Sequence, residues 1–277
     1  MKKSKYRWIY IVAFILVALI TVFFIFGAER SSYFEALDAT HPDAKWLINQ
    51  PIAHRGYHNE KTAPENSLEA FSEAIKKGYA IELDVLLSKD DYVIVVHDKN
   101  LERLTGADID VSDMTLDQIK HLTLLDTQIT IPTLEETLEL VNSKVPILLE
   151  IKSTGLNHHL DELTYSIIKD YEGEIAIQSF NTSSIRWFMK NAPDITRGLI
   201  LSGNIKFDIA NKFIDNLYML YSNPNFVSYK YNNLLKTDFS ELRKDGLIVL
   251  GWTVNESMLN TREFVQYCDN IILEAND

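Results

Sequence analysis

The sequence predicts an α/β domain in which eight parallel strands, each followed by a helix, close into a β/α barrel. Short apolar runs alternate with amphipathic helical stretches from residue 51 onward, with no low-complexity linker between them. After one hairpin arm is set aside, eight strand candidates remain, and eight βα units in about 225 residues are typical of a barrel. An open, doubly wound sheet is the alternative architecture.

Nine segments are strand candidates because they are short and rich in apolar residues. Only residues 88–92 separate the second candidate from the third, whereas a crossover between parallel strands needs about a dozen residues or more. The third candidate is therefore predicted to run antiparallel to the second, as a hairpin arm. The nine candidates are Ile52–Arg55, Ile81–Leu87, Val93–His97, Ile147–Ile151, Ile175–Phe180, Arg197–Leu201, Phe226–Tyr229, Ile248–Val254 and Asn270–Leu273.

The helices between these strands have recognisable start signals. A capping box combines a hydrogen-bond acceptor at the N-cap with a glutamate or glutamine three residues later. Three pairs in the sequence have this spacing, namely Asn66 with Glu69, Thr115 with Gln118 and Thr133 with Glu136.

The N-terminus predicts a membrane anchor. Trp8–Phe26 carries no charge, and its 19 residues would form a helix about 28 Å long, close to the thickness of a bilayer core. Four basic residues precede it, so the positive-inside rule predicts a cytoplasmic N-terminus and an extracellular catalytic domain. A cleaved signal peptide is the alternative, and it also exports the domain. The predicted division is a cytoplasmic tail at 1–7, a single-pass anchor at 8–27, a tether at 28–50 and the barrel domain at 51–277.

Charge and cysteine content exclude some functions. A formal net charge of -12 argues against nucleic acid as a partner, because no basic stripe is available to neutralise a phosphate backbone. The single cysteine, Cys268, cannot form an intrachain disulfide or a cysteine-based zinc site. Any catalytic metal must therefore be held by oxygen or imidazole ligands.

Acidic side chains lie where two of the predicted strands end. Glu82 and Asp84 are two residues apart, so both point to the same face of their strand, and Glu150 and Lys152 repeat this spacing on the next barrel strand. Adjacent buried carboxylates are costly unless a cation compensates them. Three inward carboxylates at one barrel mouth suit a hard divalent cation, Mg²⁺ or Ca²⁺. A structural ion pair, such as Glu150 with Lys152, is the alternative.

Two histidines and two cations accompany these acids. His54 ends the first predicted strand and His97 ends the hairpin arm, and as a pair they suit acid–base cleavage of a phosphate ester. Arg55 and Lys152 would supply positive charge to a phosphate and its transition state. Trp252 is a candidate for an apolar wall beside the ligand. His58 lies close enough to this group for its role to stay open.

The order of these residues closely resembles that of the glycerophosphodiester phosphodiesterases. The resemblance covers about residues 52–272, and the joint occurrence of its parts in this order is highly specific. It departs from the family at residues 202–246 and at the end, where an Asp-Gly-Ile-Ile-Thr-Asp type of segment is replaced by residues 269–274. The matching residues are His54–Gly56, Pro64–Ser67, Ala70–Phe71, Gly78, Ile81–Val85, Val95–Asp98, Leu101, Arg103, Thr105–Gly106, Ile131–Glu136, Glu150–Lys152, Gln178–Phe180 and Gly251–Asn255.

The resemblance implies a barrel with a small insertion after the second strand, at roughly residues 98–130. It implies His54 and His97 as general acid and base. It implies a single Ca²⁺ or Mg²⁺ ion on the three carboxylates. It also implies that Arg55 and Lys152 contact the phosphate and that Trp252 lies near the substrate. The expected products are an alcohol and sn-glycerol 3-phosphate.

Two further functions are compatible with the same residues. A lysophospholipase D-like enzyme would act on lipids beside its own anchor, so that its substrate is a lipid-derived phosphodiester. A catalytically silent, membrane-tethered module would bind phosphodiesters, although neither histidine nor any of the three acids is missing. A panel of glycerophosphodiesters and lysophospholipids distinguishes these possibilities.

Overall fold

The computed structural model describes residues 42–203, 208–244 and 246–275, together with Tyr10, Phe14 and Leu16. The predicted tail at 1–7 and, apart from those three positions, the predicted anchor at 8–27 lie outside the described residues. Among the residues that are described, no helix is both long and apolar enough to span a bilayer.

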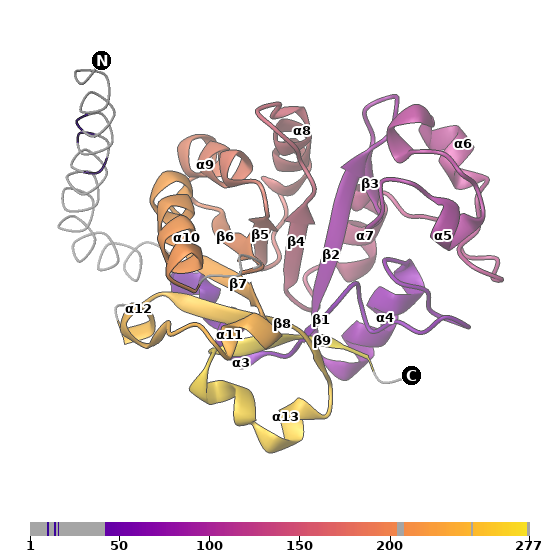
Figure 1. Cartoon of the computed structure of the whole chain (residues 1–277). Helices are drawn as coiled ribbons and strands as arrows, with labels where there is room; N and C mark the ends of the chain where they lie inside the picture. The colour runs from indigo at the N-terminus through magenta and orange to yellow at the C-terminus, as the bar shows by residue number, and fades with distance from the viewer. Residues whose placement is uncertain are drawn as a thin grey trace, which may run out of the picture.

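Eight parallel strands form a closed barrel (Figure 1). The first strand pairs with both the second and the last, so the barrel has no open edge and the alternative of an open sheet is wrong. The strands are β1 (Ile52–Ala53), β2 (Ala80–Leu87), β4 (Ile147–Ile151), β5 (Ile175–Ser179), β6 (Thr196–Leu201), β7 (Phe226–Lys230), β8 (Ile248–Asn255) and β9 (Asn270–Glu274).

The hairpin arm is confirmed. Strand β3 (Val93–Val95) pairs antiparallel with β2, with Val95 opposite Val85. Three predicted strands end earlier than expected, because β1 ends at Ala53, β3 at Val95 and β5 at Ser179. His54 and His97 therefore lie just beyond their strands, at the start of the loops.

Helices surround the barrel and one short helix closes its amino-terminal end. Trp46 and Leu47 are buried there, and Asn270 Nδ2 donates hydrogen bonds to the carbonyl oxygens of Leu47 (2.8 Å) and Gln50 (2.6 Å). Residues 42–49 of the predicted tether are thus helical. The helices outside the insertion are η1 (Pro42–Lys45), α3 (Trp46–Asn49), α4 (Leu68–Lys77), α7 (Leu134–Val141), α8 (His159–Ile168), α9 (Thr182–Asn191), α10 (Asp208–Ser222), α11 (Tyr231–Leu234), α12 (Ser240–Lys244), α13 (Met258–Thr261) and η3 (Glu263–Gln266).

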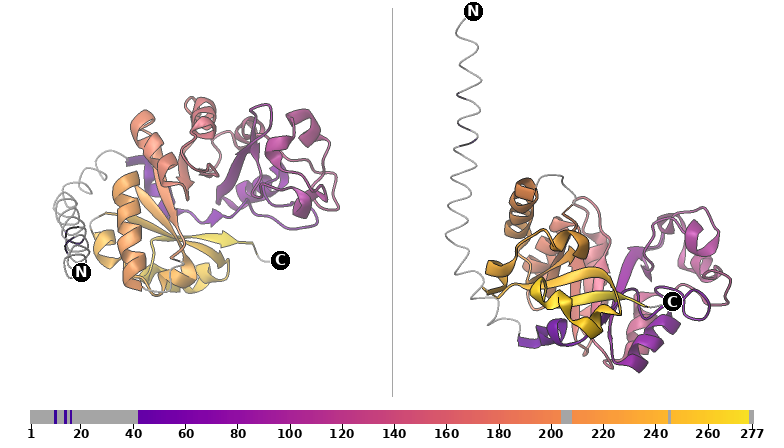
Figure 2. Two further views of the ribbon diagram at one scale, coloured as in Figure 1. Left: turned by 45° about the horizontal axis from the view of Figure 1, so that its top comes forward. Right: turned by 60° about the horizontal axis from the view of Figure 1, so that its bottom comes forward.

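The expected insertion is a small subdomain beside β2 and β3. It contains α5 (Glu102–Thr105), η2 (Val111–Asp113) and α6 (Leu116–Lys120), and it buries its own apolar cluster, which includes Leu101 and Ile119. Figures 1 and 2 show this segment at one side of the barrel in every view.

Two of the three predicted capping boxes are confirmed and one is wrong. Thr115 and Thr133 make both hydrogen bonds of the box. Helix α4 instead begins at Ser67, whose Oγ accepts from the backbone N–H of Ala70 at 3.1 Å. Asn66 adopts a positive φ of 55° before this N-cap, and its side chain turns inward to the barrel mouth.

Strand alternation divides the core into two layers. Ile147, Leu149 and Ile151 belong to the outer layer beneath the helices, whereas Leu148 belongs to the cluster inside the barrel. Glu150 continues the inner row at the carboxyl end of the same strand, since residues two apart share a face. The strand pattern therefore aims charged side chains into the barrel mouth.

Candidate active site

Three buried carboxylates converge where β2 and β4 lie side by side, with Asp84 opposite Glu150 in the register. Glu82, Asp84 and Glu150 are only 2%, 1% and 8% exposed. Each offers an oxygen, and these three oxygens lie within 4.8 Å of one another. The structure thus brings the three predicted metal ligands together.

Local charges do not neutralise this group completely. Lys152 Nζ lies 3.0 Å from Asp84 Oδ1 and 2.9 Å from Glu150 Oε1. Burial would raise the pKa of Asp84, but the nearby cations Lys152, His97 and Arg55 hold it below its usual value. Burial and the charge of Asp84 raise the pKa of Glu82. An oxygen-only donor set with uncompensated negative charge fits a hard divalent cation.

His54 forms a hydrogen bond with Glu274, the final residue of β9. Its Nδ1 donates to Glu274 Oε2 at 2.7 Å, and its side chain is 18% exposed. Burial alone would lower the pKa of His54, but the hydrogen bond to Glu274 and the charge of Glu82 outweigh it, so that the pKa is raised. His54 also lines a cavity, and Nε2 is the ring nitrogen that does not bond Glu274.

His97 also bonds a carboxylate through Nδ1, but its pKa is lowered. Its Nδ1 lies 2.6 Å from Asp98 Oδ1, so Nε2 is again the free ring nitrogen. Burial lowers the pKa of His97, and the charges of Lys152 and Arg55 add to that effect against the opposing influence of Asp84.

Arg55 lies in a constrained turn directly after His54. Its φ is 53°, an uncommon value for a residue with a side chain, and its backbone N–H donates to Glu82 Oε2 at 2.9 Å. One guanidinium nitrogen, NH1, donates to Glu65 Oε1 at 2.7 Å. Within the part of the chain that the structure describes, Arg55 Nε is buried without a hydrogen-bond partner, 3.6 Å from Asp84 Oδ2. A phosphate oxygen would satisfy this donor.

An ionic chain joins Arg55 to His97. Arg103, from α5 of the insertion, binds Glu65 through two nitrogens at 2.7 and 2.8 Å. Its Nε donates to Asp98 Oδ2 at 2.6 Å, which is the same carboxylate that contacts His97. Through Arg103, the insertion therefore holds both the carboxylate that bonds Arg55 and the carboxylate that bonds His97.

Two amide side chains complete the surroundings of the carboxylates. Asn66 Nδ2 donates to Asp84 Oδ2 at 2.9 Å. Gln178 Nε2 donates to Glu82 Oε1 at 3.3 Å, and its oxygen accepts from Ser228 Oγ at 2.7 Å. These contacts orient the carboxylate oxygens that remain available to an ion.

Trp252 and Phe180 form an aromatic wall of the cavity. The ring of Trp252 meets that of Phe180 edge to face with centroids 5.7 Å apart, and Trp252 Nε1 donates to Ser228 O at 3.1 Å. Both rings line a cavity of about 250 Å³ that also contains His54, Arg55, Glu82, His97 and Glu150.

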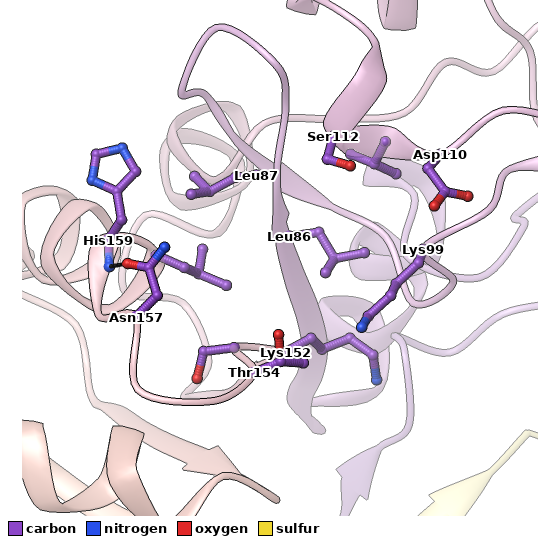
Figure 3. Close-up of a pocket in the computed structure, with 12 residues that line it drawn as sticks. Leu86, Leu87, Lys99, Asp110, Ser112, Lys152, Thr154, Asn157 and His159 are labelled. Carbon is purple, nitrogen blue, oxygen red and sulfur yellow. Dashed lines mark hydrogen bonds between the residues drawn. The ribbon is translucent and has the colours of Figure 1, made fainter.

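A second cavity adjoins the carboxylates on the side of the insertion. This groove of about 320 Å³ runs between the end of β2 and the loop that follows β4. Figure 3 shows Lys99 and Lys152 extending into one end of it, with Leu87, Asn157 and His159 farther away. Lys152 lines the groove and also contacts Asp84 and Glu150, so this one side chain connects the groove with the carboxylates.

Several supporting residues were missed by the sequence reasoning. Glu274 ends the altered terminal segment at residues 269–274, and Asn66 was assigned to a helix cap. The sequence contains only a weak signal for Asp98, Arg103 and Glu65, namely that residues of opposite charge recur near the predicted histidines. Cys268 is buried, and burial raises the pKa of its thiol to about 12.

Fold and site together define a β/α-barrel hydrolase with a carboxylate-rich centre. The model of the glycerophosphoryl diester phosphodiesterase family matches residues 54–273, which span nearly all of the barrel. The chain belongs to this family and is a phosphodiesterase.

Individual relatives agree with this assignment. A glycerophosphodiester phosphodiesterase of Caldanaerobacter subterraneus subsp. tengcongensis is 32% identical over 237 residues, covering 80% of this chain and 93% of that protein. A lysophospholipase D of Rattus norvegicus is 28% identical over 258 residues, covering 79% and 81%. The structure is similar to that of an Oleispira antarctica phosphodiesterase solved with the product sn-glycerol-3-phosphate. That match has a TM-score of 0.70 and 25% identity, and it covers 83% of this chain and 94% of that one.

Proposed function

We propose that the chain hydrolyses glycerophosphodiesters to an alcohol and sn-glycerol 3-phosphate, with His54 and His97 as the proton-transferring groups. The observation that carries this proposal is the convergence of two imidazoles, each bonded through Nδ1 to a carboxylate, on the cavity beside three buried acids. Glu82, Asp84 and Glu150 would hold one Ca²⁺ or Mg²⁺ ion, which when bound would neutralise charge on the phosphodiester oxygens.

Arg55 and Lys152 bind and orient the phosphate. Arg55 Nε has no hydrogen-bond partner among the residues that the structure describes, so it would donate to a phosphate oxygen. Lys152 contacts Asp84 and Glu150 and also lines the groove. Both cations also oppose the negative charge that grows on the phosphoryl oxygens as the bond to the leaving group breaks.

The two histidines differ in the direction of their pKa, which supports opposite roles. His97, with its lowered pKa, is neutral near pH 7 and accepts the proton of the attacking hydroxyl at Nε2. A new P–O bond forms, the ester P–O bond breaks, and His54 Nε2 gives its proton to the departing alkoxide. The nucleophile is either a glycerol hydroxyl, which gives a cyclic phosphate that is then hydrolysed, or water.

A diester has two arms, and two cavities lie near the carboxylates. One is lined by Glu82 and Glu150, and the other by Lys152, which contacts Asp84 and Glu150. The glycerol arm lies against Trp252 and Phe180, and the departing alcohol lies in the groove with Lys99. A headgroup panel with glycerophosphocholine and glycerophosphoglycerol tests this orientation. Reversing the charge of Lys99 should alter the ratio between the two substrates.

A second candidate substrate is a lysophospholipid. Phe180 and Leu156 are 51% and 79% exposed and belong to loops at the carboxyl end of the barrel. Such side chains would contact an acyl chain, and a similar protein from rat is a lysophospholipase D. Activity on lysophospholipids that exceeds activity on glycerophosphodiesters would favour this function.

The uncharged stretch at residues 8–26 supports a single-pass anchor at the cell membrane with the catalytic domain outside. Resistance of the full chain to alkaline extraction from membranes tests the anchor, and protease accessibility in intact cells tests its orientation.

The central experiment measures hydrolysis by the full chain in detergent, with Ca²⁺, with Mg²⁺ and after chelation. His54→Ala and His97→Ala should each lower kcat by roughly 10²- to 10⁴-fold, the contribution typical of a general acid or base. Metal binding by both variants should persist, because neither imidazole is among the three ligands. Full activity in either variant would reject the assignment.

A further inference from the structure

Glu274 contacts two imidazoles with its two carboxylate oxygens. Oε2 accepts from His54 Nδ1 at 2.7 Å, and Oε1 accepts from His58 Nε2 at 2.8 Å. The three groups come from the end of β9, the end of β1 and the loop before α4. The histidine side chains are 18% and 17% exposed, so both are largely withdrawn from solvent.

This arrangement determines which proton His54 can transfer. A carboxylate only accepts hydrogen bonds, so His54 Nδ1 carries its proton in both charge states of the ring. The transferable proton is therefore the one on Nε2. The negative charge of Glu274 also stabilises the imidazolium form that donates it.

His58 restrains the carboxylate itself. A carboxylate bonded only to His54 could rotate about its side-chain bonds, whereas a donor on each oxygen defines its plane. The contact between the end of β1 and β9 does not depend on these side chains, because the backbone N–H of His54 already donates to Leu273 O at 2.9 Å. Ordering these three side chains costs conformational entropy, and its effect is to fix the orientation of the His54 imidazole.

We propose that Glu274 and His58 are positioning residues for His54, and that neither of them touches the substrate. Two observations place them behind the imidazole. Neither lines the cavity that contains His54 and His97. Glu274 bonds Nδ1 of His54, and His58 bonds the other oxygen of Glu274 and does not bond His54 itself. This inference rests on the proposed function, in which His54 protonates the leaving group.

The test compares leaving groups. A glycerophosphodiester with an alkyl alcohol needs a proton on its departing oxygen, whereas a p-nitrophenyl phosphodiester leaves as a stable anion. Glu274→Gln keeps the size of the side chain but removes its charge. We expect it to lower kcat on the alkyl substrate by roughly 10²-fold, with a much smaller loss on the aryl substrate and unchanged KM and metal affinity.

His58 supplies the matched pair of variants. His58→Ala should lower kcat on the alkyl substrate by less than Glu274→Gln does. His58→Gln should recover part of that loss, because its amide N–H can donate to Glu274. His121→Gln, at an exposed histidine of the insertion, is the control and should behave as the wild type.

The outcomes separate this inference from the proposed function. A wild-type chain that hydrolyses none of the diesters with either metal rejects the proposed function itself. An active wild type whose Glu274→Gln variant loses nothing, or loses the same factor on alkyl and aryl substrates, overturns the positioning role alone. If His58→Ala is as active as the wild type, His58 has no positioning role.

Discussion

The electrostatic surroundings of the two imidazoles differ although each bonds a carboxylate through Nδ1. His54 faces Glu274 and Glu82, and these negative charges outweigh the effect of burial on its pKa. Burial and the charges of Lys152 and Arg55 lower the pKa of His97, and they prevail over the opposing effects of Asp84 and Asp98. The residue type alone would give both side chains a pKa of about 6.5. Their neighbours, drawn from distant parts of the chain, create the asymmetry that acid–base catalysis needs.

This asymmetry predicts a bell-shaped dependence of kcat/KM on pH. His97 must be neutral, and its pKa is lowered, so the ascending limb should lie below about pH 6.5. His54 must be protonated, and its pKa is raised, so the descending limb should lie above about pH 6.5. A pH–rate profile at saturating metal checks both limbs. Two limbs on the same side of the ordinary histidine pKa would contradict the assignment.

At the scale of elements, the turn after β1 positions the front of the site. Arg55 and Gly56 both have positive φ values, 53° and 80°, which turn the chain back against α4. A Cβ on Gly56 would lie 2.9 Å from backbone and side-chain atoms of Ala70 and Phe71. This close packing holds the backbone N–H of Arg55 against Glu82. The sequence places a glycine here, but only the packed helix explains why a larger residue would not fit.

Gly56→Ala should therefore destabilise the protein and lower its activity. The positive φ costs about 1–2 kcal/mol for a residue with a Cβ, and overpacking against α4 adds about 1–3 kcal/mol. Gly78→Ala is the matched control, because Gly78 also has a positive φ (69°) but has nothing within 4 Å of the added Cβ. Denaturant unfolding measures both variants. Equal losses of unfolding free energy would show that contact with α4 does not matter.

At the scale of the whole molecule, barrel closure gathers the acids. β2 and β4 are neighbours in the barrel, and Asp84 lies opposite Glu150 in their register although the two residues are 66 positions apart in the sequence. Burial raises the pKa values of Glu82 and Glu150. The folded chain thus stores unfavourable charge at one site, and a bound cation would relieve it.

A divalent cation should consequently stabilise the full chain. Ligand at about 100 times its Kd adds about 2.7 kcal/mol to the free energy of unfolding. For a domain of this size that corresponds to a rise in Tm of about 5–10 °C. Thermal unfolding of chelator-treated protein, with and without added Ca²⁺ or Mg²⁺ at constant ionic strength, measures the shift. Asp84→Asn should reduce it strongly, and an undiminished shift in that variant would place the ion elsewhere.

The sequence by itself determined the strand order, the antiparallel arm, two helix caps and the side chains of the proposed metal site. These depend on local spacing, since period-two alternation and short connections leave few arrangements of the chain. Tertiary structure alone decided that Asn66 leaves its expected cap for Asp84, that Arg103 joins Glu65 to Asp98, and that Glu274 meets His54 and His58. Those contacts join residues far apart in the chain, so their partners are set by how the barrel closes and how the insertion packs.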